Sequence, residues 1–251
     1  MRAMRAVRGL SALARGLVGA LLPAQCAGCR AWDEVLCQSC RCLVGGPARL
    51  ASLDGARGPI PLAAVGDYSG PLRRIVLTAK HSSRTDVTDV LHEAGAVLGT
   101  ALAQVLGVAA SPAAALGSPG GRASSEGRSV DVWVVPAPSS WKRRLRGRQV
   151  ALPLARAAAR ALAASARPGV RVRVVDAVRL RVGASSQSGK VGAQRTVGRI
   201  GSMRALAVPG HGALVVAVDD VVTTGATIRE MERVLGRIEA VAAICRPGLI
   251  A

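Results

Sequence analysis

The sequence has few aromatic residues: its 251 residues include no phenylalanine, one tyrosine and three tryptophans. Proteins that bind single-stranded nucleic acid without sequence preference usually stack bases on aromatic rings, so this composition argues against a general binder of that kind. Acidic residues are also scarce, with 15 against 34 lysines and arginines, which gives a formal net charge of +19. Only three of the 34 cations are lysine. The charge therefore has two open interpretations, a polyanionic partner or a GC-rich coding sequence that favours arginine.

Long apolar runs are missing as well. The longest uncharged stretch, 94–121, contains glycine, threonine, glutamine and proline, which dilute it below what a membrane span requires. The basic N-terminus differs from a secretory signal, because Arg15 interrupts its apolar part and Gln25 stands where a small residue is expected. Leucines at near-helical spacing instead predict an amphipathic helix there. We therefore expect a cytoplasmic protein without a transmembrane segment.

The composition divides the chain into four segments. A basic amphipathic helix is predicted within 1–25, a cysteine-rich module at 26–43, and a glycine-, proline- and alanine-rich linker at 44–61. Across 62–251, short β-branched runs alternate with longer helical patterns, and half of all residues in the chain are apolar. This pattern predicts an α/β domain with a parallel sheet flanked by helices. A low-complexity stretch, 108–129, is expected to form a flexible insertion in that domain.

The hydrophobic periodicity of this domain predicts its main elements. The expected helices are 86–106, 149–166 and 226–238. The expected strands are 130–135, one or two within 170–182, 213–218 and 240–245. The run 213–218 is the most apolar strand, which is typical of burial on both faces. Cys245, in the last strand, is expected to be a buried free thiol.

Four of the six cysteines form two closely spaced pairs. Cys26 and Cys29 are followed, after seven residues, by Cys37 and Cys40, and two residues separate the members of each pair. Two such pairs place four thiolates on two tight turns, which is the ligand set of a tetrahedral structural Zn²⁺. The alternative is a pair of disulfides, which a cytoplasmic setting disfavours. Cys42 could also replace Cys40 as the fourth ligand.

The most informative stretch follows the predicted strand 213–218. Asp219 and Asp220 reach the carboxyl edge of the expected parallel sheet, where open α/β sheets bind ligands. The loop Thr223-Thr224-Gly225-Ala226-Thr227 then leads into a helix N-terminus, whose N–H groups and threonine hydroxyls can hold a dianionic phosphate. A sugar phosphate would satisfy both the carboxylates and the loop. The alternative is an acid pair that merely ends a strand and threonines that cap a helix.

This string resembles the phosphoribosyl-pyrophosphate (PRPP) signature of type I phosphoribosyltransferases. A closer resemblance is to the ComF (GntX-like) family of cytoplasmic phosphoribosyltransferase-like proteins, and it covers nearly the whole chain except the N-terminal helix and the 108–129 insertion. It rests on the four-cysteine module, the PRPP signature and these further segments: Tyr68-Ser69-Gly70 with Lys80, Val135 to Pro138, Arg144 to Gly147, and Gln187 followed by Arg195.

The resemblance implies a type I phosphoribosyltransferase fold and a role for each part of the site. The residues implied to hold the ribose hydroxyls are Asp219 and Asp220. Those implied to hold the 5′-phosphate are Thr223, Thr224, Gly225, Ala226 and Thr227. Those implied to reach the pyrophosphate are Pro136, Ala137, Pro138, Lys80, Arg146 and Arg148, although the basic cluster 142–148 can also be interpreted as a solvated loop. Mg²⁺ would bridge pyrophosphate and ribose oxygens.

The resemblance therefore predicts an enzyme that transfers phosphoribose from PRPP to an acceptor and releases pyrophosphate. Neither the acceptor nor the oligomeric state follows from the residues. The alternative expectation is a non-catalytic factor that handles single-stranded DNA during DNA uptake in natural competence, with PRPP binding vestigial or regulatory.

Overall fold

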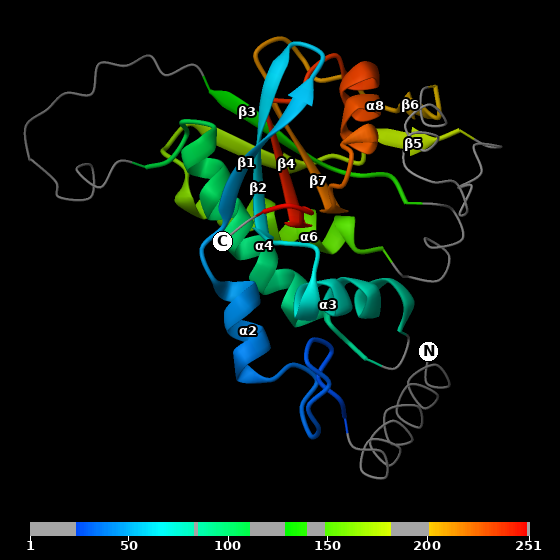
Figure 1. The fold of residues 1–251 in the computed structure, drawn as a ribbon. Helices are drawn as coiled ribbons and strands as arrows, with labels where there is room; N and C mark the ends of the chain where they lie inside the picture. Colours follow the sequence, from blue (N-terminus) through cyan, green and yellow to red (C-terminus); the bar gives the residue numbers. More distant parts are fainter. Residues whose placement is uncertain (1–23, 83–84, 111–128, 140–148, 182–200, 250–251) are drawn as a thin grey trace, which may run out of the picture.

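The computed structural model describes residues 24–82, 85–110, 129–139, 149–181 and 201–249. A six-stranded sheet forms its centre, with helices on both faces (Figure 1). The strands of this sheet are β1 (Arg49–Gly55), β2 (Gly58–Gly66), β3 (Val130–Pro136), β4 (Val170–Val174), β7 (Leu214–Val221) and β8 (Ala240–Cys245). A separate two-stranded ribbon contains β5 (Val178–Leu180) and β6 (Met203–Ala205). The helices are α2 (Gln38–Gly45), α3 (Gly70–His81), α4 (Thr88–Val105), α6 (Ala151–Ser165) and α8 (Ala226–Leu235).

The direction in which the chain progresses from strand to strand reverses in the middle of the sheet. The order is β1-β2-β8-β7-β3-β4, and neighbouring strands are parallel except for β1 and β2. The chain passes from β3 through α6 to β4 on one side, whereas it passes from β7 through α8 to β8 on the other. In an open sheet this reversal leaves a crevice at the carboxyl ends of the two central strands. The predicted α/β class, with a mostly parallel sheet flanked by helices, is confirmed.

The central strands are apolar throughout because both faces of the sheet are covered. On β7, Val216 and Val218 pack into a core that includes α3, α4 and α6, while Val215 and Ala217 pack into a second core that includes α8. Every residue of β8 is buried. Burial on both faces explains why these strands lack the apolar and polar alternation of a sheet with one face in water.

The prediction of a linker at 44–61 is wrong. This segment contains β1 and the first part of β2, which form an antiparallel hairpin at the edge of the sheet, with Leu53 opposite Ile60. Most residues of the edge strand β1 are exposed, so it lacks a regular apolar pattern. Pro59 and Pro61 also argue against a strand, but they lie where β2 pairs with β1 alone, because pairing with β8 begins at Leu62.

The other predicted elements agree with the structure where it describes them. The predicted helices appear as α4, α6 and α8, and the strands as β3, β4 with β5, β7 and β8. β7 continues beyond the predicted strand through the acid pair, and α8 ends at Leu235 because Gly236 adopts a left-handed conformation, with φ of 86°. The helix predicted within 1–25 and most of the insertion 108–129 lie outside the described residues. None of the described helices is long and apolar enough to cross a membrane.

Helices α4 and α6 approach each other closely through small residues. A Cβ atom added to Gly99 would lie against the carbonyl oxygen of Ala158, 2.7 Å from Ala161 Cβ and 2.8 Å from Leu162 N. Because backbone cannot yield as a side chain does, Gly99→Ala is expected to lower the free energy of unfolding by about 2–3 kcal/mol in denaturant titrations. Gly45→Ala, where an added Cβ meets nothing within 4 Å, is the matched control. Equal stability of the two variants would contradict this close packing.

Candidate functional site

The predicted cysteine ligands form one cluster. The Sγ atoms of Cys26, Cys29, Cys37 and Cys40 all lie within 4.8 Å of one another. Cys37 Sγ is 3.7 Å from Cys26 Sγ and 3.5 Å from Cys29 Sγ, near the edge of about 3.8 Å that Zn–S bonds of about 2.3 Å give a tetrahedron. All four thiols are free, so the disulfide alternative does not describe this arrangement, and Cys42 is exposed outside the cluster. These donors and their spacing fit a structural zinc ion.

The backbone of the first cysteine pair folds into a tight turn around its thiols. The amide of Arg30 donates to the carbonyl of Cys26 at 3.0 Å, and Arg30 has a φ of 71°. The amide of Ala31 donates to Cys29 Sγ at 3.5 Å. Gly28 lies so close to the second pair that an added Cβ would be 2.6 Å from Cys40 Sγ. A side chain at Gly28 would therefore displace a ligand.

The cluster crowds thiols whose charged forms repel one another. Burial opposes the thiolate of Cys26, but backbone amides, led by that of Cys37, outweigh burial and lower the pKa of Cys26 to about 6. At Cys40, burial and then the neighbouring thiols raise the pKa well above its usual range. A divalent cation would remove this repulsion between the thiolates, because it binds deprotonated thiols and compensates their charge.

A second group of predicted residues meets at the carboxyl ends of β7 and β3, where the strand order reverses. β7 and β3 are parallel neighbours, with Val218 opposite Pro136, and the amide of Ala137 donates to the carbonyl of Val218 at 2.7 Å. The segment predicted to hold pyrophosphate, Pro136 to Pro138, therefore starts beside the residue that precedes Asp219. The structure brings these two parts of the predicted site together from 82 residues apart in the sequence.

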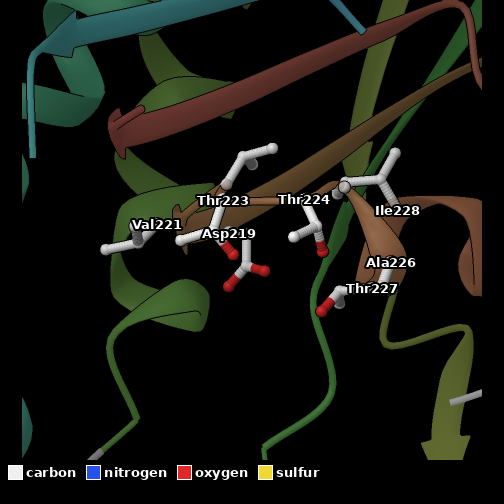
Figure 2. A pocket seen from close by; sticks show the side chains of 9 residues that line it. Asp219, Val221, Thr223, Thr224, Ala226, Thr227 and Ile228 are labelled. Atoms are coloured by element: carbon white, nitrogen blue, oxygen red, sulfur yellow. The ribbon is translucent and has the colours of Figure 1, made fainter. Parts of the chain in front are cut away.

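The acid and the threonine loop enclose a small cavity of about 90 Å³. Its lining includes Asp219 and the whole predicted phosphate loop, Thr223 to Thr227. Figure 2 shows the carboxylate of Asp219 and the hydroxyls of Thr224 and Thr227 turned toward the same space below the loop. The Asp219 carboxylate also accepts a hydrogen bond from the amide of Asp220 at 2.8 Å, which fixes its orientation. The cavity therefore combines an oriented carboxylate with hydroxyls and a helix N-terminus.

The β1–β2 hairpin supports the loop from outside. Gly225 precedes the first residue of α8 and has φ and ψ of 71° and 5°, a left-handed conformation that favours glycine. An added Cβ at Gly225 would be 2.5 Å from Leu53 Cδ1. Leu53 is thus part of the wall behind the loop. Sequence reasoning misses it, because the composition of 44–61 indicates a linker and not a strand. The heptapeptide 49–55 alone carries no signal that could have identified this contact.

Two buried glutamates tie α8, which begins in this loop, to its neighbours. The carboxylate of Glu230 accepts hydrogen bonds from the amide of Met203 at 3.1 Å and from Arg233 at 2.8 Å. Burial raises the pKa of Glu230, but the guanidinium of Arg233 and the amide of Met203 outweigh burial, so its pKa lies below the usual range. Glu232 accepts from the amide of Ala56, at the tip of the hairpin, at 2.9 Å. The helix behind the loop is therefore fixed both to β6 and to the hairpin.

The second acid of the pair has a different neighbour. Asp220 Oδ1 lies 2.9 Å from Lys80 Nζ, and their side chains are 15% and 17% exposed. Lys80 belongs to the last turn of α3, which lies near the carboxyl edge of the sheet (Figure 1). The structure therefore brings Lys80 to the predicted site, in contact with an acid of the same site. Arg146 and Arg148, the other predicted phosphate contacts, lie outside the described residues.

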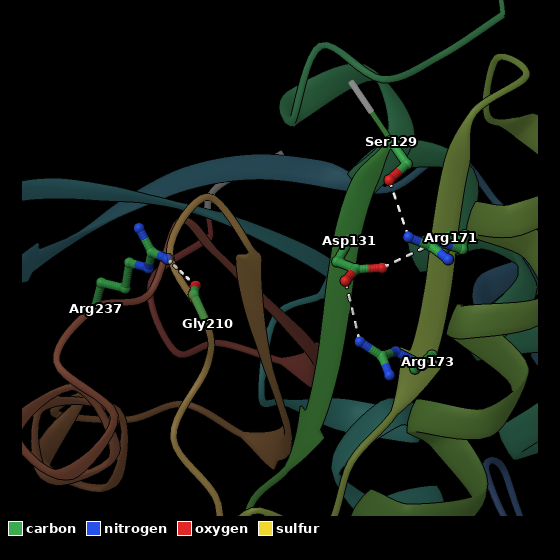
Figure 3. Close-up of polar contacts among 6 residues, drawn as sticks. All are labelled: Ser129, Asp131, Arg171, Arg173, Gly210 and Arg237. Carbon is green, nitrogen blue, oxygen red and sulfur yellow. Dashed lines mark hydrogen bonds and ion pairs between the residues drawn. The ribbon is translucent and has the colours of Figure 1, made fainter. Parts of the chain in front are cut away.

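Several arginines lie away from this site in surface ion pairs. Near the amino end of β3, Asp131 lies 3.4 Å from Arg171 Nε and 3.1 Å from Arg173 Nη2, both on the neighbouring edge strand β4 (Figure 3). The same view shows Arg237 donating to the carbonyl of Gly210, at 2.8 Å. Arg171 and Arg173 are more than half exposed. These contacts agree with the interpretation that part of the positive charge belongs to solvated surfaces.

The chain was also compared with known proteins. No protein-family model and no curated protein sequence matches it.

Proposed function

We propose that the protein is a phosphoribosyltransferase-like protein of the type I fold that binds PRPP with Mg²⁺ and transfers phosphoribose to an acceptor. The observation that carries the proposal is the meeting of Asp219 and the Thr223–Thr227 loop with the Pro136–Pro138 segment at the reversal of strand order. Each part offers what one part of PRPP requires, namely acceptors for ribose hydroxyls and N–H donors for phosphate. The resemblance to the ComF family supports the same assignment.

In the proposed reaction the acceptor's nucleophilic atom bonds to the anomeric carbon of ribose as the bond from that carbon to pyrophosphate breaks. Asp219 would orient the ribose through its hydroxyls, and the loop would fix the 5′-phosphate at the N-terminus of α8. These contacts hold the sugar at both ends while positive charge develops at its anomeric carbon. Mg²⁺, arriving with PRPP, would neutralise oxygens of the leaving pyrophosphate. Most of the rate would thus come from positioning and electrostatics.

Asp219→Asn tests the proposal directly. It keeps the size of the side chain but removes the charge that strengthens hydrogen bonds from ribose hydroxyls. Titration calorimetry with PRPP and Mg²⁺ is expected to show binding by the wild type and binding weakened by about 10- to 100-fold in the variant, as for the loss of a hydrogen bond to a charged group.

Asp131→Asn is the matched control, because it neutralises an aspartate at the amino end of β3, away from the carboxyl edge that holds the site, and it should bind PRPP as the wild type does. A wild-type chain that does not bind PRPP would overturn the proposed function. Where binding is found, a screen of nucleobases for pyrophosphate release identifies the acceptor. Binding without release by any base would restrict the proposal to PRPP recognition.

A further inference from the structure

The two adjacent acids of the site face different surroundings. Successive residues of a strand point to opposite faces of the sheet, and β7 includes both Asp219 and Asp220. Asp219 lines the cavity below the threonine loop. Asp220 falls in the alternation of Val216 and Val218, which pack toward the helices α3, α4 and α6. It is there that Lys80 of α3 meets it at 2.9 Å.

The surroundings of Asp220 make its partner hard to replace. Both side chains of the pair are more than four-fifths buried. The neighbouring Cys245 is fully buried, and burial, followed by the charges of Asp67 and Asp220, raises the pKa of its thiol to about 12. In such a place a carboxylate without its cation costs far more than on the surface. A ribose hydroxyl, which is neutral, would compensate Asp220 less well than the ammonium group does.

The negative charge of PRPP also favours Lys80 as the partner of Asp220. PRPP presents several negative charges to a site that itself holds two adjacent carboxylates. Lys80 cancels one of them, which reduces repulsion of the incoming phosphates. An ammonium group has three N–H donors, so one can bind Asp220 while the others remain for phosphate oxygens.

We propose that Asp220 is a positioning residue that holds Lys80 for the phosphates of PRPP, while Asp219 alone binds the ribose hydroxyls. This inference rests on the proposed function and divides the acid pair between two tasks. It predicts that Asp220 affects the affinity for PRPP only because it holds Lys80 in place. The removal of Asp220 should therefore matter little once Lys80 has been removed.

A double-mutant cycle tests this dependence, with PRPP and Mg²⁺ as the probe in titration calorimetry. Lys80→Met removes the ammonium and leaves Asp220 uncompensated beside the ligand, so binding is expected to weaken by about 10- to 100-fold. Adding Asp220→Asn to Lys80→Met removes that repelling carboxylate, so the double variant should bind at least as tightly as Lys80→Met. Adding Asp219→Asn to Lys80→Met, as the matched control, should weaken binding further.

The outcomes separate this inference from the function on which it rests. A wild-type chain that does not bind PRPP overturns the proposed function and the inference with it. If the wild type binds and Asp220→Asn costs a further tenfold in the Lys80→Met background, Asp220 contacts the ligand itself, and the inference alone is overturned. Since an unpaired Asp220 can destabilise the fold, the calorimetry is repeated with Lys80→Gln, whose amide can donate to Asp220, and the same order of affinities is expected. Thermal unfolding without ligand checks that each variant is folded.

Discussion

Cys40→Ser is expected to release zinc from a chain that otherwise binds about one equivalent, and to lower its unfolding temperature by about 10 °C or more. Structural zinc contributes apparent binding free energies of about 10–16 kcal/mol in small zinc peptides, and a metal that binds only the folded state stabilises that state. The cysteine module is also continuous with the main core. Cys26, Leu36, Cys40 and Val44 belong to the same buried cluster as residues of α3 and α4. Loss of the metal should therefore loosen more than the module.

Cys42→Ser is the matched control for this prediction. Cys42 is exposed, and its Sγ accepts a hydrogen bond from Gln38 Nε2 at 3.7 Å instead of facing the cluster. Its replacement should change the free energy of unfolding by no more than about 0.5 kcal/mol and leave the zinc content unchanged. Metal analysis under reducing conditions and thermal unfolding measure both quantities. Zinc retained by Cys40→Ser but lost from Cys42→Ser would assign the fourth ligand to Cys42.

The sequence predicted the parts of the fold that follow from strong local patterns. The apolar run of β7 and the helical periodicity of α4 and α8 could be predicted because the buried positions in these elements carry mostly apolar side chains. The acid pair and the threonine loop were placed correctly at the end of β7, because a strand that leads into a helix N-terminus fixes where its loop must lie. The cysteine spacing likewise predicted the cluster, because a short backbone turn is enough to bring the two cysteines of each pair together.

The contacts that sequence reasoning missed depend on which elements are neighbours in space. The hairpin of β1 and β2 is stabilised by its partners rather than by its own pattern, so its composition resembled a linker. Leu53 meets Gly225, and Glu232 meets the amide of Ala56, only because the hairpin folds over α8. The ion pair of Lys80 and Asp220 also spans elements that are distant in the sequence. Nothing local distinguishes Leu53, Ala56 or Glu232 from ordinary surface positions, and the motifs that single out Lys80 and Asp220 do not indicate that the two side chains meet.

Gly225→Ala is expected to weaken PRPP binding by about 10- to 100-fold, the scale of effect that a displaced ligand-positioning group produces. Two unfavourable effects add at position 225, one from the backbone conformation and one from a collision with Leu53. An L-residue in the left-handed conformation loses about 1–2 kcal/mol, and the new methyl would be 2.5 Å from Leu53 Cδ1 and 3.0 Å from its Cδ2. Leu53 is buried in the core beside Ile60 and Ile228, which restricts the movement of its side chain, so we expect the loop to shift as well. Its amides would then no longer point at the proposed phosphate site.

Two further variants separate these costs. Gly236, at the other end of α8, has a φ of 86°, but an added Cβ there meets nothing within 4 Å. Gly236→Ala therefore pays the conformational cost alone and should bind PRPP as the wild type does. Leu53→Ala in the Gly225→Ala background removes the atoms that collide and should restore most of the affinity in calorimetry, even though the loss of a buried leucine lowers stability. If Leu53→Ala restored nothing, the left-handed conformation of Gly225 itself, and not the packing of the hairpin, would set the shape of the loop.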